Sequence, residues 1–221
     1  MKKLVIFDLD GTLLDTVPDI TDNINGMLLH FGYETLSEKQ VASLVGSGAK
    51  KLVTDCIAVS VKKPLTEEEL SERLSYYNGN YTSSSSPKTK PFDGIGKVLT
   101  DLKKDGFLIA IMTNKPQETT DRVVKEHLSE FSFDKIVGGS GKVKCKPDKT
   151  ATVNLLNELG VSPENAFFVG DGETDVLTAI NTGTFGISVL WGYRSKIQLE
   201  KAGAKVFAST PEELYSIIKN G

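Results

Sequence analysis

Two aspartates stand two residues apart in the segment Asp8-Leu9-Asp10-Gly11-Thr12, directly after a short apolar run. Residues two apart at the end of a strand project to the same side, so both carboxylates can share one space. Carboxylates that close repel each other unless one is protonated or a cation lies between them. Gly11 allows the chain to turn away with a positive φ. Such a pair alone is most often an aspartate-rich turn, so its meaning depends on the rest of the chain.

Three other polar groups lie next to apolar runs or helical segments farther along the chain. Thr113-Asn114 offers a hydroxyl and turn amides to an anion, and Lys146 precedes a helical segment. The glycine-bounded loop Gly170–Asp175 adds two acids, Asp171 and Asp175. Each group alone has an ordinary structural explanation, but ligands of parallel α/β sheets bind beyond the carboxyl ends of the strands. Chance convergence of two carboxylate pairs, a threonine and a lysine at that edge is improbable, so together they indicate a functional site.

The elements that would hold these residues alternate between apolar runs and amphipathic segments, which is typical of βαβ units around a parallel sheet. Short, nearly continuous apolar runs predict strands that are buried on both faces. These runs are Lys3–Phe7, Phe107–Met112, Lys135–Val137, Ala166–Val169 and Phe185–Leu190, with a sixth short strand at Lys205–Ala208. We therefore expect an α/β fold with a Rossmann-like parallel sheet.

Helices are predicted where apolar residues recur at helical spacing. The apolar stripe at residues 95–102 is closed by Gly106, and the stripe at residues 153–159 is closed by Gly160, as glycine C-caps would do. Near the end of the chain, Thr210-Pro211-Glu212-Glu213 combines an N-cap, a proline at the first helical position and a capping-box glutamate.

The long stretch after the first strand breaks this rhythm, because it has helical signals and no convincing strand. Apolar stripes fall at residues 20–28 and 52–61, and Thr66-Glu67-Glu68-Glu69 supplies a capping box for a third helix. We therefore predict two domains: an α/β core of residues 1–14 and 87–221, and an all-α helical cap of residues 15–86.

Composition narrows the class of protein. The 221 residues are 39% apolar and 25% charged with a net charge of −3, which is ordinary for a globular chain and shows no basic stretch for a nucleic acid. The uncharged run Val176–Tyr193 is interrupted by Asn181 and Gly183, so we expect no membrane span. Cys56 and Cys145 are far apart and form no CxxC motif, which favours two reduced thiols in a cytoplasmic protein.

In this order and context, the motifs resemble those of the haloacid dehalogenase superfamily, and the resemblance covers the whole chain, including a helical cap after the first motif. Pro18-Asp19-Ile20, Val45-Gly46-Ser47-Gly48-Ala49 and Trp191-Gly192-Tyr193 are similar to phosphoglycolate phosphatases in particular. The resemblance implies a Mg²⁺-dependent phosphatase whose substrate is a small phosphorylated metabolite, with 2-phosphoglycolate the leading candidate.

The resemblance also implies roles for the acidic residues. Asp8 would be the nucleophile that becomes an aspartyl-phosphate. Asp10 would protonate the departing alkoxide and then take a proton from the hydrolytic water. Mg²⁺ prefers oxygen ligands, and the family pattern assigns it the Asp8 carboxylate, the Asp10 backbone carbonyl and Asp171. Asp175 would orient Lys146 or a metal-bound water.

The remaining core motifs would hold the phosphoryl group. Lys146, Thr113 and the Asn114 amide would stabilise charge on the transferring group, and Thr12 is the further candidate in the first motif. Charge counting supports a cation, since three ionised aspartates precede a dianionic phosphate, and Mg²⁺ with Lys146 offsets three charges. Two departures from the family pattern are Gly172, where many members have serine, and a cysteine before Lys146, which we interpret as inert and packed.

Substrate choice is expected in the cap. We predict that the segment from Gly46 to Lys51 faces the core, because its glycines allow close backbone approach and a helix beginning there presents free amides. Lys50 or Lys51 could pair with the carboxylate of phosphoglycolate. The alternative is that both lysines only solvate the helix surface. Gly46 and Gly48 complete the candidate substrate-binding residues.

Other functions stay open at this point. A β-phosphoglucomutase-like or pyrophosphatase-like member could share the motifs, whereas a dehalogenase would not need Asp10. A catalytically silent regulatory homologue is the alternative outside enzymes. We interpret His30 and His127 as structural or solvated, and expect the cap tyrosines and Trp191 to pack rather than bind. Either a monomer or a homodimer is compatible with the sequence.

Overall fold

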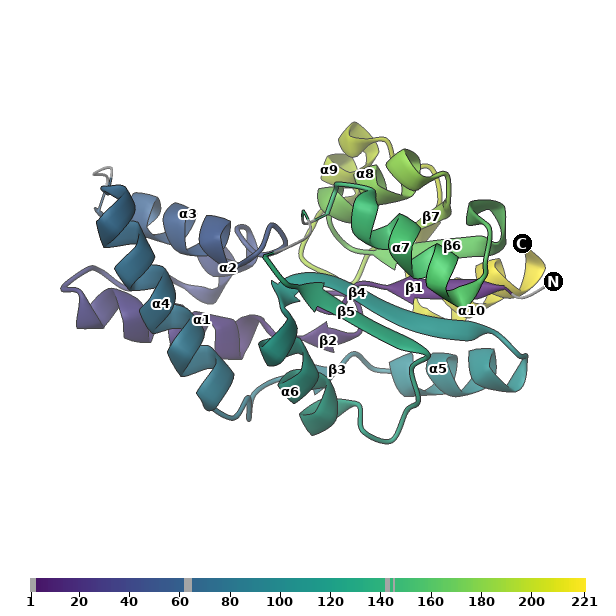
Figure 1. The fold of residues 1–221 in the computed structure, drawn as a ribbon, viewed down its shortest axis with the longest axis horizontal. Coiled ribbons are helices and arrows are strands. Elements are labelled where there is room, and N and C mark those ends of the chain that lie inside the picture. Colours follow the sequence, from purple (N-terminus) through teal and green to yellow (C-terminus); the bar gives the residue numbers. More distant parts are fainter. Residues whose placement is uncertain (1–2, 62–64, 142–143, 145) are drawn as a thin grey trace.

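The computed structural model describes residues 3–61, 65–141, 144 and 146–221 (Figure 1). Its centre is one sheet of six parallel strands in the order β5-β4-β1-β6-β7-β8. The strands are β1 (Leu4–Phe7), β4 (Leu108–Pro116), β5 (Lys135–Gly139), β6 (Ala166–Gly170), β7 (Phe185–Val189) and β8 (Phe207–Ala208). All six predicted strands are present, so the predicted α/β class with a parallel sheet is confirmed.

The strand order reverses at β1, which lies between β4 and β6. From β1 the chain builds outward through β4 and β5 on one side, and later through β6, β7 and β8 on the other. Such a reversal opens a crevice beyond the carboxyl end of the central strand, where ligands of open α/β sheets bind. The fold therefore directs attention to the residues that follow β1.

Both faces of the sheet are covered by helices, as the continuous apolar runs predict. Along β1, Val5 and Phe7 join one hydrophobic cluster, while Leu4 and Ile6 join another on the opposite face. The first cluster includes residues of α5 (Ile95–Lys104), α6 (Gln117–His127) and α10 (Pro211–Asn220). The second includes residues of α7 (Thr150–Leu159) and α8 (Glu173–Thr182), and α9 (Lys196–Ala202) packs on α8. A 3₁₀ turn, Pro163–Asn165, precedes β6.

Local signals set the helix ends. The Thr66 hydroxyl accepts from the Glu69 backbone N–H, and the Thr210 hydroxyl accepts from that of Glu213, so both predicted N-caps are confirmed. Gly160 ends α7 in the left-handed conformation that its C-cap role requires. Among the described helices, none is both long and apolar enough to cross a bilayer.

Four helices lie beyond the carboxyl end of the sheet, on the left of Figure 1, far from both chain termini. They are α1 (Val17–His30), α2 (Glu38–Ala42), α3 (Ala49–Val61) and α4 (Glu67–Ser83). Their buried residues form a hydrophobic cluster separate from the two on the sheet. The three predicted helices are present, and the short α2, begun by the Ser37–Gln40 capping box, was not predicted. The separate cluster supports residues 15–86 as a cap, which we propose as a domain.

The chain leaves and re-enters the core through a two-stranded connection. β2 (Leu14–Asp15) pairs antiparallel with β3 (Lys90–Pro91), a pairing too short to leave an alternating pattern in the sequence. Next to it, Asp19 Oδ2 accepts hydrogen bonds from the Lys88 N–H, the Thr89 N–H and the Thr89 hydroxyl at 2.6–3.0 Å. This buried carboxylate fastens α1 to the returning strand.

Candidate active site

The first motif leaves β1 as a tight turn that presents Asp8 and Asp10 at the edge of the sheet. Asp8 is buried, and its Oδ1 accepts from the Leu9 N–H at 2.7 Å. Gly11 has φ +83°, and a Cβ there would lie 2.4 Å from Asp171 Oδ2. The turn therefore needs glycine both for its left-handed backbone and for the close approach of Asp171.

A buried lysine joins the first and last motifs. Lys146 Nζ lies 2.9 Å from Asp8 Oδ1 and 2.6 Å from Asp175 Oδ1. Its backbone is held by the Asn114 side chain, which accepts from the Lys146 N–H at 2.7 Å and donates to the Lys146 carbonyl at 3.1 Å. Asp175 Oδ2 also accepts from the Gly172 N–H at 3.0 Å. Asp175 thus makes the contact expected of a residue that orients Lys146.

The negative charges of the carboxylates at this edge are only partly balanced by nearby positive charge. Burial raises the pKa of the Asp8 carboxyl from 3.8 to about 7, even though Lys146 pulls it down. Burial, then the charges of Asp175 and Asp8, raises the pKa of Asp171 to about 8. Burial disfavours the charge on Lys146, but Asp175 and Asp8 outweigh it and raise the Lys146 pKa. One lysine therefore does not neutralise three buried acids.

The donor set at this edge fits a hard divalent cation. Asp8, Asp171 and Asp175 each have an oxygen within 4.8 Å of the others, and all three residues are buried. Among the described residues, Asp171 accepts from two uncharged donors, the Tyr193 N–H at 2.7 Å and the Thr12 hydroxyl at 3.3 Å. Clustered carboxylate oxygens of this kind are ligands that Mg²⁺ prefers.

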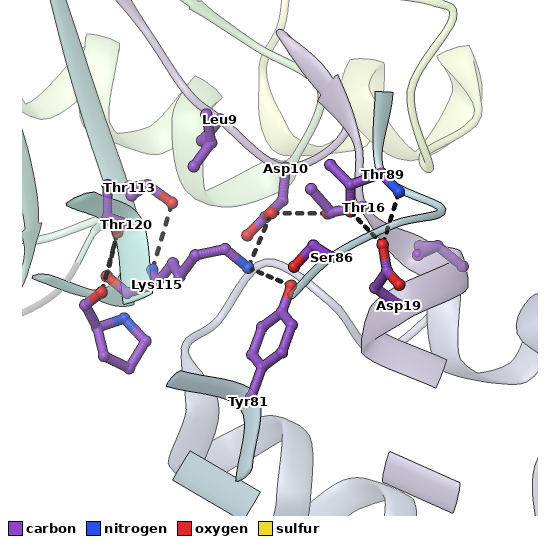
Figure 2. A network of polar contacts seen from close by, with 12 residues as sticks. Leu9, Asp10, Thr16, Asp19, Tyr81, Ser86, Thr89, Thr113, Lys115 and Thr120 are labelled. Atoms are coloured by element: carbon purple, nitrogen blue, oxygen red, sulfur yellow. Dashed lines mark hydrogen bonds and ion pairs between the residues drawn. The ribbon is translucent and has the colours of Figure 1, made fainter. Parts of the chain in front are cut away.

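Asp10 faces a second buried lysine (Figure 2). Its Oδ1 accepts from the Thr16 hydroxyl at 2.6 Å and lies 3.0 Å from Lys115 Nζ. Lys115 also donates to the Tyr81 hydroxyl, at 3.2 Å. Within the described part of the chain, the contacts of the Asp10 carboxylate with Thr16 and Lys115 both fall on Oδ1, so the geometry leaves Oδ2 available to a substrate oxygen. Thr16, Lys115 and Tyr81 were not among the predicted site residues.

The cap closes over this edge through a few polar contacts. Asn114 Nδ2 donates to the Gly46 carbonyl at 3.0 Å, and a Cβ on Gly48 would lie 3.4 Å from the Asn114 carbonyl oxygen. Arg194, which follows β7, donates to the carbonyls of Ala42 at 2.9 Å and Val45 at 2.5 Å. The predicted segment from Gly46 to Lys51 therefore meets the core at its glycines, Gly46 and Gly48, whereas Lys50 and Lys51 are exposed.

Core and cap together enclose a small cavity. The volume open to the centres of water molecules is about 40 Å³. One water molecule needs roughly 10–15 Å³ of such volume. Its lining comprises Asp8, Asp10, Ile20, Val45, Gly46, Gly48, Ala49, Leu52, Tyr77, Asn78, Tyr81, Thr113, Asn114, Lys115, Pro116 and Thr119. The cavity therefore has room for a small ligand next to both aspartates.

Three predicted substrate-binding residues lie elsewhere. The side chains of Lys50 and Lys51 are 66% and 62% exposed, lie near Glu67 and Asp55 respectively, and do not line this cavity. They lie one turn along α3 on its solvent side, so the structure does not bring either ammonium to the aspartates. Thr12 is buried beneath the site, with its hydroxyl on Asp171. The prediction for Cys145 falls outside the described residues.

The segment after β7 contributes contacts that the sequence did not single out. A Cβ on Gly192 would lie 2.3 Å from Asp171 Cβ and 2.4 Å from the Gly11 carbonyl oxygen. The Tyr193 hydroxyl accepts from the Thr16 N–H at 2.9 Å, and so reaches the start of the cap. The only sequence signal was the Trp-Gly-Tyr similarity to one subfamily.

Predictions for single aromatic residues are mixed. Trp191 packs against the sheet cluster and donates to the Thr12 carbonyl at 3.1 Å, so the packing role is confirmed. His30 stacks on Tyr76 at 4.2 Å between ring centroids, as a structural residue would. Tyr77 and Tyr81 do pack in the cap cluster, but both also line the cavity, so packing alone was an incomplete interpretation.

Comparisons with known proteins agree with this architecture. A family model for haloacid dehalogenase-like hydrolases matches residues 5–189. Phosphoglycolate phosphatase 1 of Pseudomonas aeruginosa is 34% identical over 194 residues, covering 87% of this chain and 71% of the relative. Phosphoglycolate phosphatase of Vibrio cholerae is 32% identical, covering 86% and 85%. A crystal structure of a provisionally named phosphoglycolate phosphatase from Lactobacillus delbrueckii superimposes with a TM-score of 0.90 at 31% identity, covering 99% of both chains.

Proposed function

We propose that this chain uses 2-phosphoglycolate as its substrate, Asp8 as its nucleophile and Mg²⁺ as its cofactor. The chain belongs to the haloacid dehalogenase-like hydrolase family and is a phosphoric monoester hydrolase. One observation carries the mechanism: Asp8 and Asp10 line the same cavity at one sheet edge, with Lys146 Nζ 2.9 Å from Asp8 and Lys115 Nζ 3.0 Å from Asp10.

In the first step, Asp8 attacks phosphorus and the bond from phosphorus to the ester oxygen breaks. Lys146 and the Thr113 hydroxyl stabilise the phosphoryl oxygens while the charge redistributes. Asp10 gives a proton to the departing ester oxygen through the carboxylate oxygen that Thr16 and Lys115 leave available. The products of this step are an aspartyl-phosphate on Asp8 and a free alcohol.

In the second step, water attacks the phosphorus of the aspartyl-phosphate. Asp10 takes a proton from that water, which restores the Asp8 carboxylate and releases inorganic phosphate. The closed cap and the small cavity limit the water that reaches the site. Asp175 holds Lys146 in place throughout, because the Lys146 ammonium lies closer to Asp175 Oδ1, at 2.6 Å, than to Asp8 Oδ1, at 2.9 Å.

Mg²⁺ would be held by Asp8, Asp171 and the Asp10 backbone carbonyl, and it supplies the charge needed to bring a phosphate dianion to buried carboxylates. Asp8 and Asp171 belong to the buried cluster of three carboxylates, which supports these two ligands, and the third member, Asp175, contacts Lys146. A cytoplasmic location also remains part of the proposal, in keeping with a Cys56 thiol that is free and buried.

One observation separates this function from a silent homologue, and assays separate it from the other enzymes. A β-phosphoglucomutase-like reaction is tested with a hexose phosphate as substrate. Asp10 and its partners are in place, whereas a silent regulatory homologue has no need of them. A pyrophosphatase-like reaction is separated by assay, since it requires pyrophosphate rather than a carbon ester.

The mechanism is tested by trapping the intermediate. Enzyme mixed with 2-phosphoglycolate labelled with ³²P and quenched in acid within milliseconds should carry label on the protein, and hydroxylamine should release it as expected of an acyl phosphate. An Asp8→Asn variant should carry none. Turnover of substrate by the wild type with no labelled protein at any quench time would overturn the covalent mechanism.

A further inference from the structure

Lys115 is a buried cation that the two proposed steps use only as a neighbour of Asp10. Its side chain is only 4% exposed, and it extends from the end of β4 to a point between Asp10 and Tyr81 (Figure 2). Nζ lies 3.0 Å from Asp10 Oδ1, 3.2 Å from the Tyr81 hydroxyl and 4.7 Å from the centre of the Tyr81 ring. The ammonium therefore stands where the core meets the cap.

This ammonium is compensated less fully than that of Lys146. Lys146 lies between two carboxylates, whereas the contacts of Lys115 are one carboxylate, which it shares with Thr16, and a neutral hydroxyl. Burying a cation is costly unless it is paired and hydrogen-bonded. Lys115 thus has capacity for one more anionic or polar acceptor.

The surroundings of Lys115 are suited to a ligand. It is the only cationic residue among the described residues that line the cavity. The cap side of the cavity is largely apolar, with Ile20, Val45 and Leu52 in its wall. In such surroundings one buried charge discriminates strongly between ligands, because an unmatched polar group is expensive there.

We propose that the Lys115 ammonium and the Tyr81 hydroxyl form a subsite for an anionic group on the leaving alcohol, so that the enzyme selects phosphate esters of short hydroxy acids. The proposal rests on the proposed function, in which Asp10 contacts the ester oxygen. In 2-phosphoglycolate the carboxylate is bonded to the carbon that carries the ester oxygen, so its oxygens lie roughly 3 Å from that oxygen, about one hydrogen-bond length. Lys115 is one such length from Asp10, so the distances agree.

The subsite also links substrate choice to the cap. Lys115 comes from the core and Tyr81 from α4, so both groups meet at the ligand only when the cap covers the core. A neutral alcohol would leave the ammonium with Asp10 as its one anionic contact beside the neutral Tyr81 hydroxyl. The competing explanation is that Lys115 serves only to position Asp10, in which case every phosphomonoester depends on it equally.

The test compares two substrates that differ in that charge. Wild type and Lys115→Met are assayed with 2-phosphoglycolate and with ethyl phosphate, which has the same number of carbons and no carboxylate. Charge-assisted hydrogen bonds predict that Lys115→Met loses about 10- to 100-fold in kcat/KM for 2-phosphoglycolate and less than about threefold for ethyl phosphate. Equal losses on both substrates, or no loss on either, would overturn the subsite.

Matched variants guard against general damage. Lys125→Met removes an exposed lysine from α6 and should match wild type on both substrates. Tyr81→Phe keeps the ring and removes the hydroxyl, so it should lower kcat/KM severalfold for 2-phosphoglycolate alone. If Lys115→Met fails to fold, this variant tests whether the subsite exists. If the wild type hydrolyses neither ester, the proposed function is refuted. If the wild type hydrolyses both esters and the variants lose the same activity on each, only the subsite is refuted.

Discussion

The two walls of the cavity are built on different principles. The core side concentrates charge: Asp8 lines the cavity and continues, outside the lining, into a buried chain of contacts with Lys146 and Asp175 at 2.6–2.9 Å. The cap wall is mostly apolar and meets the core through single hydrogen bonds, such as the one from Asn114 to the Gly46 carbonyl. The core side is suited to chemistry that tolerates no displacement, and the cap wall to choosing a ligand and admitting it. The predictions below test this division.

The largest loss is expected from a change on the core side. Lys146→Met removes the cation from two buried carboxylates and from the phosphoryl group, so kcat should fall about 10³-fold on every phosphomonoester. Steady-state kinetics on 2-phosphoglycolate and ethyl phosphate measure this. A loss confined to one substrate would mean that Lys146 belongs to substrate choice, and the division between the walls would fail.

A smaller but still substantial loss is expected where the core packs around Asp171. The added methyl group in Gly192→Ala would collide with Asp171 and the Gly11 carbonyl, so Mg²⁺ affinity should drop about 10- to 100-fold. Calorimetric titration with Mg²⁺ alone measures this without turnover. Gly26→Ala is the matched control, because a Cβ on that residue of α1 has nothing within 4 Å. Unchanged Mg²⁺ affinity in Gly192→Ala would contradict the account.

Loosening the cap should change binding more than chemistry. Arg194→Met removes two hydrogen bonds to cap carbonyls, each worth about 1 kcal/mol, so KM should rise roughly 30-fold with kcat changed far less. Lys196→Met, on the exposed surface of α9, provides the comparison. A fall in kcat with constant KM would show that Arg194 acts on the chemistry instead.

The smallest effects are expected on the outside of the cap. Lys50→Ala and Lys51→Ala remove exposed lysines that lie near cap acids, so KM for 2-phosphoglycolate should change less than about twofold. The sequence-based expectation was the reverse, a carboxylate contact from one of them. A KM raised tenfold in either variant would restore that expectation and require α3 to turn toward the site.

The sequence allowed the core to be predicted because its signals are local. Strands that are buried on both faces read as apolar runs, and polar residues at their ends are brought together by the sheet itself. The same alternation rule that paired Asp8 with Asp10 also places Lys115 on the same side of β4 as Thr113, two residues earlier. Lys115 was therefore within reach of the sequence argument and was overlooked.

The cap could be predicted only as helices. Periodicity shows which face of a helix is buried, but not which end of that helix meets the core, so Lys50 and Lys51 were placed by analogy. Tyr81 lies on a helix whose apolar stripe explains its burial without any ligand. Arg194 contacts carbonyls about 150 residues earlier in the chain, and no local pattern encodes such a contact.

The central claim is that Asp8 performs metal-dependent phosphoryl transfer at this edge of the sheet. Phosphate release from 2-phosphoglycolate should be fast with Mg²⁺, abolished by EDTA and restored by added Mg²⁺, and Asp8→Asn should lose at least about 10⁴-fold in kcat. Phosphate release that survives EDTA, or an Asp8→Asn variant that retains the wild-type rate, would contradict the account.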